Sequence, residues 1–388
     1  MKRKVGIVTF HNHINYGAAL QAYGLKYTLE KMGLEPYFIC DKRKGNKLSG
    51  CQTEEAPGKD AAAAAEGKQE SIAATEPAKS GVDALRSRSL QFQEMQKGLF
   101  RAFAAQNFRE TDLTKESDLN EEFDFFVAGS DQIWNCEVTG VEPFWFLDFA
   151  RKEKRFSYAA SFGMDALPER GKMWYKERLR NFSAISVREK SGRGIVRELL
   201  DKEAVVCPDP VFLPEIEDWK ALMKPCEEAV VVYMTEFDMG LYRAAQKHAD
   251  NLKIPFVYIG YTNFCIPGFK LTVCDPAEWL GYLFHAKVIF TNSFHGTVFG
   301  AFFHKRLYFK PLIQLAKRNN RVNNLMESLH AEQRPCGDMP NIYEVVFPEG
   351  WERTDERVAG LRDMGKAYLS AVVNNVILEE RRGNMKED

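Results

Sequence analysis

One histidine stands in a short polar stretch between two apolar runs. The stretch TNSFHG, residues 291–296, follows AKVIF and precedes TVFGAFFHK, a pattern typical of a strand that ends where a helix begins. The free N–H groups and the dipole at a helix start favour a bound anion, and a histidine there is placed to exchange a proton with it. His295 is therefore a candidate catalytic residue, with Asn292, Ser293 and Gly296 as candidate binding residues. A histidine that is only structural is the alternative.

A carboxylate occupies a comparable position after an earlier apolar run. FDFFVAGSDQIWN has the pattern of a buried strand that ends in Gly129, Ser130 and Asp131, with Trp134 close behind. A carboxylate at the carboxyl edge of a sheet is able to take a proton from a sugar hydroxyl or to hydrogen-bond a polyol. Asp131 is therefore a candidate base, and its two neighbours are candidate binding residues. The alternative is a helix cap beside a tryptophan of the core.

Several side chains would suit an anionic substrate. YAASFG and ISVRE each read as a strand that ends in polar groups, with Ser161 in the first and Arg188 in the second. Arg188 is either a surface charge paired with Glu189 or a cation that points into a cleft. Farther along, Arg318 and Arg321 are spaced to share one face of a helix start, which suits a phosphate or a carboxylate. A solvated run of charge is the usual outcome of such a pattern.

Two further segments have a structural explanation of at least equal weight. NYGAALQAYGL places Asn15, Tyr16 and Gly17 just before a helix N-terminus, but the loop is neither a GxGxxG nor a Walker sequence. A ligand loop and an ordinary asparagine-capped turn fit it equally well. In CPDPVFL, Asp209 lies between two prolines, which favours a rigid crossover between domains over a role in catalysis.

The elements that would position these residues alternate between strand-like and helix-like patterns in two series. We expect an α/β fold with two Rossmann-like domains facing a cleft, over residues 1–215 and 216–345, followed by C-terminal helices over 346–388. Residues 45–89 are nearly free of large apolar side chains, so we expect a disordered insertion there, with a substrate lid as the less favoured alternative. The cleft between the domains is the expected site.

The composition excludes some classes of partner. The chain has 53 basic and 54 acidic residues and 45% hydrophobic residues, which argues against a general nucleic-acid or anionic-membrane surface. No signal peptide and no membrane span are expected. The 8 cysteines show no CxxC pair and no zinc-like spacing, so we expect reduced thiols in a cytoplasmic protein and no metal site.

Taken in order, these motifs resemble those of the polysaccharide pyruvyl transferase family. The matching segments are GIVTFHNHINYGAALQAYGL, FVAGSDQIWN, YAASFG, ISVREKSG, PDPVFL and FTNSFHGTVFGAFF, within residues 4–330. The resemblance implies an architecture like that of the GT-B glycosyltransferases. It also implies transfer of the pyruvyl group of phosphoenolpyruvate to two hydroxyls of a sugar in a polysaccharide or glycan-lipid precursor, which forms a cyclic ketal and releases phosphate.

The resemblance also assigns roles to the candidate residues. His295 matches the family's histidine and would be the acid that protonates the enol carbon of the donor. Arg188, Arg318 and Arg321 would hold the phosphate and the carboxylate of phosphoenolpyruvate and stabilise the leaving phosphate. No metal and no other cofactor is demanded by this mechanism.

The hydroxyls of the acceptor would be oriented by Asp131, with Ser130 and Asn15 nearby.

One feature departs from the family pattern. Many members carry an arginine two residues before the histidine, where this chain has Ser293. The missing cation would then have to be replaced by one of the two later arginines or by Lys305.

Two other functions fit the same patterns. A nucleotide-sugar glycosyltransferase of the same architecture is less favoured, because the second domain has no recognisable nucleotide-binding signature. A non-catalytic glycan-assembly protein would explain Ser293 as a mark of lost activity. For the enzyme, we expect phosphoenolpyruvate and a sugar or lipid-linked glycan as partners and no nucleic acid. We expect a cytoplasmic location, at the inner face of the membrane beside membrane-bound glycan machinery.

Overall fold

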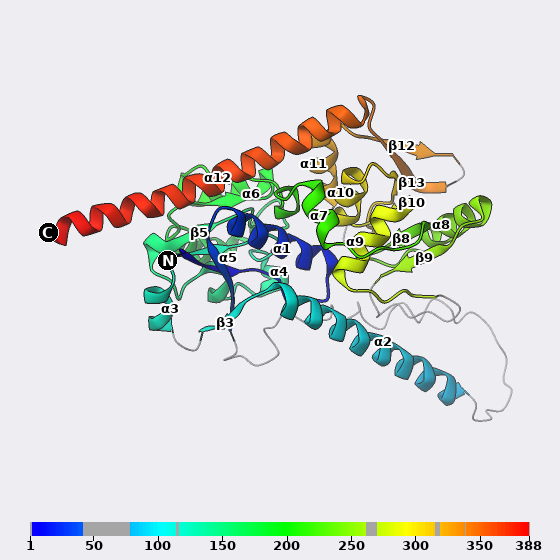
Figure 1. Ribbon diagram of the computed structural model, residues 1–388, viewed down its shortest axis with the longest axis horizontal. Helices are drawn as coiled ribbons and strands as arrows, with labels where there is room; N and C mark the ends of the chain where they lie inside the picture. The colour runs from blue at the N-terminus through cyan, green and yellow to red at the C-terminus, as the bar shows by residue number, and fades with distance from the viewer. Residues whose placement is uncertain are drawn as a thin grey trace.

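The computed structural model describes residues 2–41, 78–113, 116–260, 270–314, 319–337 and 339–387. It has two α/β lobes that lie side by side and a long helix that runs along both of them (Figure 1). Each lobe contains its own mainly parallel sheet with helices between the strands. The expected α/β fold class with two sheets is confirmed.

The first lobe is built on a parallel sheet and its covering helices. Its strands are β1 (Lys4–Val8), β2 (Glu35–Cys40), β3 (Glu110–Asp112), β4 (Phe125–Ala128), β5 (Arg155–Ser157), β6 (Ser186–Val187) and β7 (Val205–Val206). Its helices are α1 (Tyr16–Lys31), α2 (Ala78–Asn107), α3 (Glu116–Glu122), α4 (Cys136–Thr139), α5 (Glu169–Leu179) and α6 (Lys190–Leu200), with the 3-10 helices η4 (Pro143–Phe146) and η5 (Lys152–Lys154). The strand order is β3-β2-β1-β4-β5, and isolated bridges from Phe156 to Ala184 and from Ala160 to Val187 join the β6-β7 pair to its end.

The second lobe follows a short connection made of η6 (Pro210–Phe212) and α7 (Ile216–Leu222). Its strands are β8 (Ala229–Tyr233), β9 (Phe256–Ile259), β10 (Ala286–Thr291), β11 (Arg306–Phe309), β12 (Glu332–Cys336) and β13 (Met339–Val346). Its helices are α8 (Met239–Leu252), α9 (Pro276–His285), α10 (Phe294–Phe302) and α11 (Asn319–Leu329). The order is β12-β13-β11-β10-β8-β9, in which β8 to β11 are parallel and β13 runs antiparallel to both of its neighbours.

The central strands consist of continuous apolar runs, so both of their faces can be buried. Every residue of β4 (FFVA) and of β8 (AVVVY) is buried, as expected for parallel strands covered on both faces. In the first lobe, β1 lies between β2 and β4, so the strand order reverses at β1. Loops that leave β1 and β4 at their carboxyl ends therefore diverge, which is the usual place for a ligand in such a sheet.

The two lobes share one hydrophobic core. A single cluster of buried side chains contains Val5 and Leu25 of the first lobe together with Val231 and Trp279 of the second. Tyr16, in the first turn of α1, stacks on Trp279 of α9 with 5.6 Å between ring centroids. The lobes are therefore packed against each other and not merely joined by a linker.

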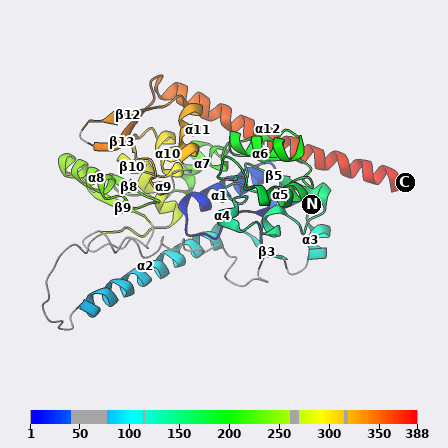
Figure 2. The same ribbon diagram turned by 180° about the vertical axis from the view of Figure 1, so that it is seen from behind.

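The C-terminal segment forms one helix, α12 (Gly350–Glu387), that contacts both lobes (Figures 1 and 2). Near its start, Asp355 lies 2.8 Å from Nε2 of His304 in the second lobe. Farther along, the Tyr368 hydroxyl donates a 2.8 Å hydrogen bond to the Ser157 carbonyl of β5. Between these points, Arg362 pairs with Glu215 of the connection at 2.7 Å.

Two local expectations differ from the structure. A disordered insertion was expected over residues 45–89. Residues 45–77 lie outside the described part of the chain, whereas residues 78–89 are helical because α2 begins at Ala78. This stretch contains Ala, Leu and Arg, which have high helix propensity. The hairpin of β12 and β13 was not expected, because β12 (EQRPC) contains a proline and is only partly buried, without the alternating apolar pattern of a half-buried strand.

The described part of the chain was also searched for membrane-spanning helices and for disulfide bonds. None of its helices combines the length and the apolar character that a bilayer crossing requires. Four of its cysteines have free thiols in the structure: Cys136, Cys207, Cys226 and Cys274. Cys51 and Cys265 lie outside the described residues.

Candidate active site

A buried arginine forms the centre of a charged cluster between the lobes. Arg188 follows β6 and has a side chain that is only 4% exposed, so it is not the surface charge that the sequence left open. Its guanidinium lies 2.6 Å from Asp209, 3.6 Å from Glu189 and 3.7 Å from Asp131. Burial alone would lower the pKa of Arg188, but the three carboxylates outweigh it and raise that pKa above its ordinary value. The arginine therefore stays charged in the interior.

Asp209 connects this arginine to the histidine of the second lobe. Its carboxylate is completely buried and lies 3.6 Å from Nε2 of His295, just beyond hydrogen-bond distance. Burial favours the protonated acid, yet the nearby His295 and Arg188 hold the pKa of Asp209 well below its usual range. The Ser130 hydroxyl contacts the same carboxylate oxygen at 3.4 Å.

Asp209 has more contacts in this cluster than the sequence pattern predicts. We expected it to stiffen a crossover, and it does cap η6 by accepting from the Val211 amide at 3.1 Å. Its other oxygen, however, faces Arg188 and His295. The signal that could have found it is its place in PDPVFL, one of the segments that carry the family resemblance.

His295 lies where helix starts from the two lobes meet. It is the second residue of α10, which is capped by the Ser293 side chain accepting from the Gly296 amide at 3.4 Å. Its ring packs against the first turn of α1, where a Cβ on Gly17 would lie 1.9 Å from Nδ1. Glycine is thus required at position 17 for the histidine to take this position. Both helix N-termini direct their free N–H groups and positive dipole ends toward this region.

Asp131 is held in a strained backbone conformation. Its φ angle is 69°, in the left-handed region that non-glycine residues rarely adopt and that costs on the order of 1 kcal/mol or more. The Gln132 amide donates to its carboxylate at 2.9 Å, and its carbonyl accepts from the Ser161 amide at 3.0 Å. Strain of this kind is typical of functional sites, where it aims a side chain. Here it accompanies the placement of the carboxylate near Arg188.

Several polar atoms of the cluster are buried without a hydrogen-bond partner. They are Nε and Nη2 of Arg188, Oε2 of Glu189 and Nε2 of His295. The other oxygen of Glu189 accepts from the Ser161 hydroxyl. Because buried polar groups in proteins are nearly always satisfied, a set of unpartnered donors and acceptors at one place indicates a site for a ligand or for ordered water.

A small cavity adjoins this cluster between the lobes. It has a volume of about 160 Å³ and is lined by Glu189 and Gly163 of the first lobe and by Asn320 and Arg321 of the second, among others. Arg188 and Arg321 approach the same ring, that of Phe294, with 5.5 and 5.9 Å from guanidinium carbon to ring centroid. Both arginines therefore lie beside the start of α10.

Three of the predicted binding residues, Asn15, Tyr16 and Asn292, make hydrogen bonds within the fold. The Asn15 side chain caps α1 by accepting from the Ala18 amide at 3.1 Å, so the asparagine-capped turn is what forms. The Tyr16 hydroxyl donates to the Cys274 carbonyl at 3.1 Å inside the interface between the lobes. Asn292 accepts from the Thr235 amide at 2.8 Å and donates to the Glu236 carbonyl at 2.6 Å, which ties together the loops after β10 and β8.

Two of the predicted glycines, Gly129 and Gly296, lie where neighbouring side chains leave no room for a Cβ atom. Two of the cations considered, Arg318 and Lys305, are not seen in the Arg188 cluster. A Cβ on Gly129 would lie 3.0 Å from Cβ of Thr9, and one on Gly296 would lie 2.5 Å from Oγ1 of Thr291. Arg318 lies outside the described residues. Lys305 follows the C-terminal end of α10, whose length of 9 residues puts it about 13 Å along the axis from the helix start, too far to replace a cation beside His295.

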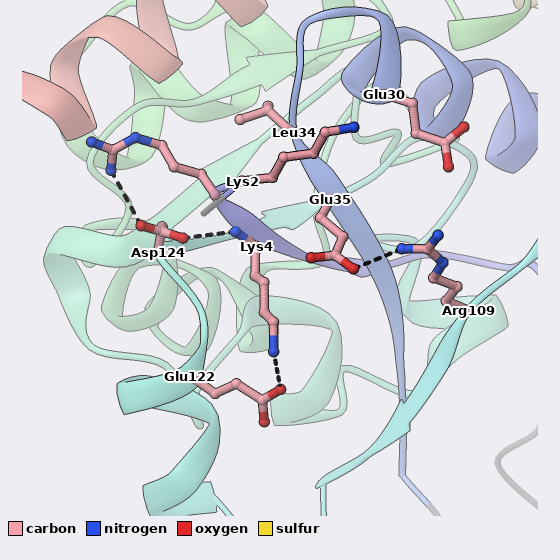
Figure 3. Close-up of a pocket in the computed structure, with 9 residues that line it drawn as sticks. Lys2, Lys4, Glu30, Leu34, Glu35, Arg109, Glu122 and Asp124 are labelled. Atoms are coloured by element: carbon pink, nitrogen blue, oxygen red, sulfur yellow. Dashed lines mark hydrogen bonds and ion pairs between the residues drawn. The ribbon is translucent and has the colours of Figure 1, made fainter.

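A larger hollow, of about 870 Å³, lies at the opposite edge of the first sheet (Figure 3). Six of its charged side chains form three pairs: Arg3 with Asp124 at 3.2 Å, Lys4 with Glu122 at 2.7 Å and Arg109 with Glu35 at 2.7 Å. It lies at the amino ends of β1 and β2, away from the edge where parallel sheets bind ligands. The charged cluster around Arg188 is therefore the better candidate site.

Comparison with known proteins finds weakly similar solved structures and one matching family. No curated relative was found. Of the solved structures, UDP-GlcNAc 2-epimerase of Methanocaldococcus jannaschii is 10% identical with a TM-score of 0.40, over 96% of this chain and 100% of its own. A UDP-glucosyltransferase of Polygonum tinctorium is 13% identical with a TM-score of 0.38, over 97% and 99%. The wall teichoic acid polymerase TagF is 8% identical with a TM-score of 0.41, over 97% and 89%.

The family match is the decisive one. The model of a family described as polysaccharide pyruvyl transferase matches residues 15–309, which is most of the chain and contains every residue of the Arg188 cluster. The resemblance seen in the sequence motifs is confirmed by this match. The chain therefore belongs to the polysaccharide pyruvyl transferase family, a family of transferases.

Proposed function

We propose that the protein transfers the pyruvyl group of phosphoenolpyruvate to two hydroxyls of a sugar in a polysaccharide or lipid-linked glycan precursor. The observation that carries this proposal is the buried contact chain from Arg188 through Asp209 to His295, whose outer nitrogen atoms have no hydrogen-bond partner. It brings a cation and a proton carrier from different lobes to one place, and ketal formation from an enol phosphate needs both.

The proposed reaction balances with these groups. A proton is added to the methylene carbon of phosphoenolpyruvate, one sugar hydroxyl forms a C–O bond to the adjacent carbon, and the phosphate C–O bond breaks. The second hydroxyl then bonds to the same carbon. Of the two hydroxyl protons released, one replaces the proton delivered to the methylene group and the other leaves with inorganic phosphate.

His295 is the proposed acid for the methylene carbon. Its Nε2 is buried, has no hydrogen-bond partner and lies 3.6 Å from the carboxylate of Asp209, whose pKa is held well below its usual range. An imidazole changes charge near neutral pH more readily than any other unperturbed side chain. Asp209 is thus a positioning residue for His295 and a counter-ion for Arg188.

The cations are proposed to bind the donor, and the carboxylates are proposed to bind the sugar. The unpartnered Nε and Nη2 of Arg188 are proposed to donate to the carboxylate or phosphate of the donor, with Arg321 at the adjoining cavity as the second cation. Asp131 and Glu189 are proposed to accept from the sugar hydroxyls. An excess of carboxylates over cations in the inner cluster suits hydroxyl groups.

The replacement of the family's arginine by Ser293 is consistent with this assignment. Ser293 caps α10, and both Arg188 and Arg321 lie near the ring of the next residue, Phe294. A cation is therefore present beside the helix start without an arginine at position 293. The acid, the base and the cations all come from side chains, and we propose that the transfer uses no metal cofactor.

Calorimetric titration with phosphoenolpyruvate, in parallel with UDP-glucose and GDP-mannose, tests the donor. The expected result is saturable binding of phosphoenolpyruvate that is lost in Arg188→Ala and weakened in the double variant Arg318→Ala, Arg321→Ala. Lys305→Ala is the matched control, since this cation lies at the other end of α10. Binding of a nucleotide sugar alone would instead identify a glycosyltransferase.

A screen of sugars and lipid-linked sugars for release of phosphate from phosphoenolpyruvate tests the reaction. The product is expected to carry a pyruvyl ketal by mass spectrometry, and His295→Gln is expected to abolish its formation. A chain that binds phosphoenolpyruvate but shows the same phosphate release with and without His295 would contradict the proposed acid. Absence of binding by every donor would favour a non-catalytic glycan-assembly protein.

A further inference from the structure

A second group of chemically reactive side chains lies at the carboxyl edge of the first sheet. His11 follows β1, Cys40 is the last residue of β2, and Glu110 is the first residue of β3. Their ligand atoms, one from each residue, all lie within 4.8 Å of one another. These residues are far apart in the sequence, and the parallel pairing of β1, β2 and β3 brings them together.

Two of the three separations are close to those between the ligands of a tetrahedral metal ion. Zn–N and Zn–O bonds of about 2.0 Å and a Zn–S bond of about 2.3 Å, at tetrahedral angles, separate nitrogen from oxygen by about 3.3 Å and nitrogen from sulfur by about 3.6 Å. The observed separations are 3.1 Å from His11 Nε2 to Glu110 Oε1 and 3.7 Å from Cys40 Sγ to the same nitrogen. An ion would therefore require little rearrangement of these side chains.

The surroundings orient the three side chains as metal ligands are usually oriented. Nδ1 of His11 lies 3.1 Å from the Thr9 carbonyl, and this contact orients the ring so that Nε2 faces Glu110 and Cys40. The Asn12 amide donates to the Glu110 carboxylate at 2.8 Å.

The group is anchored on one side and open on the other. The ring of His11 is packed against Phe38 and Phe108, with centroid distances of 4.6 and 5.9 Å. The side chain of His11 is 7% exposed, whereas that of Glu110 is 39% exposed. A fixed imidazole and a solvent-accessible carboxylate give an ion both a rigid ligand and an entry path.

We propose that His11, Cys40 and Glu110 bind one Zn²⁺ ion, with water in the fourth position. A thiolate and an imidazole favour zinc over the hard cations Mg²⁺ and Ca²⁺, which take oxygen ligands. This site is formed by different residues from the Arg188 cluster and does not depend on the proposed transfer. It would join the carboxyl ends of β1 and β2 to the amino end of β3 through one ion.

Metal titration of the full-length protein tests this site. After removal of bound metal and dialysis against Zn²⁺, the wild type is expected to retain one zinc per chain more than Cys40→Ser does. The Co²⁺ form is expected to show thiolate-to-cobalt charge-transfer absorption that Cys40→Ser loses. Cys226→Ser, which removes a half-buried thiol from the second lobe, is the matched control and is expected to keep both signals.

Glu110→Gln supplies an independent variant on the exposed side of the site. It keeps the shape of the side chain but removes the charge, and the affinity for Zn²⁺ is expected to fall at least about tenfold. Equal zinc content and equal cobalt spectra in the wild type and in Cys40→Ser would overturn the proposal. The same holds if Glu110→Gln binds Zn²⁺ as tightly as the wild type; the group would then be a histidine–glutamate ion pair only.

Discussion

Replacing Gly17 by alanine would push a methyl group into the imidazole of His295. The new Cβ would lie 1.9 Å from Nδ1, 2.4 Å from Cγ and 2.5 Å from Cε1, so it meets the ring itself and not one flexible atom. The ring and the helix would have to separate by about 1.5 Å before these atoms attract each other. We expect Gly17→Ala to lower the free energy of unfolding by about 1–3 kcal/mol, the usual cost of overpacking a filled site.

The sign of this effect should reverse once the imidazole is removed. In His295→Ala the space next to Gly17 is open, and alanine has a higher helix propensity than glycine by up to about 1 kcal/mol. Adding Gly17→Ala to His295→Ala is therefore expected to raise the free energy of unfolding by a few tenths to about 1 kcal/mol. The difference between the two backgrounds measures the coupling between α1 and the histidine directly.

Urea denaturation of the wild type, the two single variants and the double variant measures this cycle. Gly194→Ala is the control, because that glycine also lies in a helix of the first lobe and has no atom within 4 Å of its Cβ position. The control should have the same effect with and without His295. Destabilisation by Gly17→Ala of equal size in both backgrounds would refute the packing argument. If the proposed reaction holds, turnover of phosphoenolpyruvate by Gly17→Ala is expected to fall about 100-fold, since a displacement of this size moves the proposed acid out of reach.

Asp209→Asn should lower the free energy of unfolding by about 3 kcal/mol in urea denaturation, because it leaves the buried guanidinium of Arg188 without its nearest charge; an unchanged midpoint would contradict this. Because the folded-state pKa of Asp209 is depressed below the ordinary 3.8, its stabilisation is fully present above that pH and is lost as the pH falls further. Acid unfolding of Asp209→Asn should lack this component, and identical acid curves would count against it. Arg188→Lys should weaken phosphoenolpyruvate binding at least about tenfold in calorimetry, because it removes the second N–H donor of a bidentate contact; equal affinities would show that charge alone matters. Tyr368→Phe should cost about 1 kcal/mol of stability by removing the hydrogen bond to Ser157, and no loss would mean that α12 is held by packing alone.

Local patterns in the sequence were sufficient to place single polar residues at strand ends. Asp131, Arg188 and His295 each follow a strand, because an apolar run followed by small and polar residues marks the carboxyl end of a buried strand. Parallel strands gather such ends at one edge, which places Asp131 and Arg188 together in the first lobe, and the packing of the two lobes brings His295 to them. The positions of these side chains at strand ends were therefore predictable without any knowledge of their contacts.

The contacts themselves were not predictable from local patterns. Asp209 looked structural because its prolines explain it locally, whereas its partners are 79 positions away at Ser130 and in the other lobe at His295. Tyr16 looked like part of a ligand loop, but its ring lies in an interface that only the packing of the two lobes creates. The edge strand β12 escaped notice because its exposed and charged residues carry no apolar period.

The helix α12 restricts how the molecule is able to move. It is fastened to the second lobe through Asp355 and His304 and to the first lobe through Tyr368 and Ser157, while the shared core with Tyr16 and Trp279 joins the lobes below it. A hinge rotation that parted the lobes would have to break these attachments together. Exchange of substrate and product is therefore expected to proceed through motions of surface loops, with the Arg188 cluster already assembled before a ligand arrives.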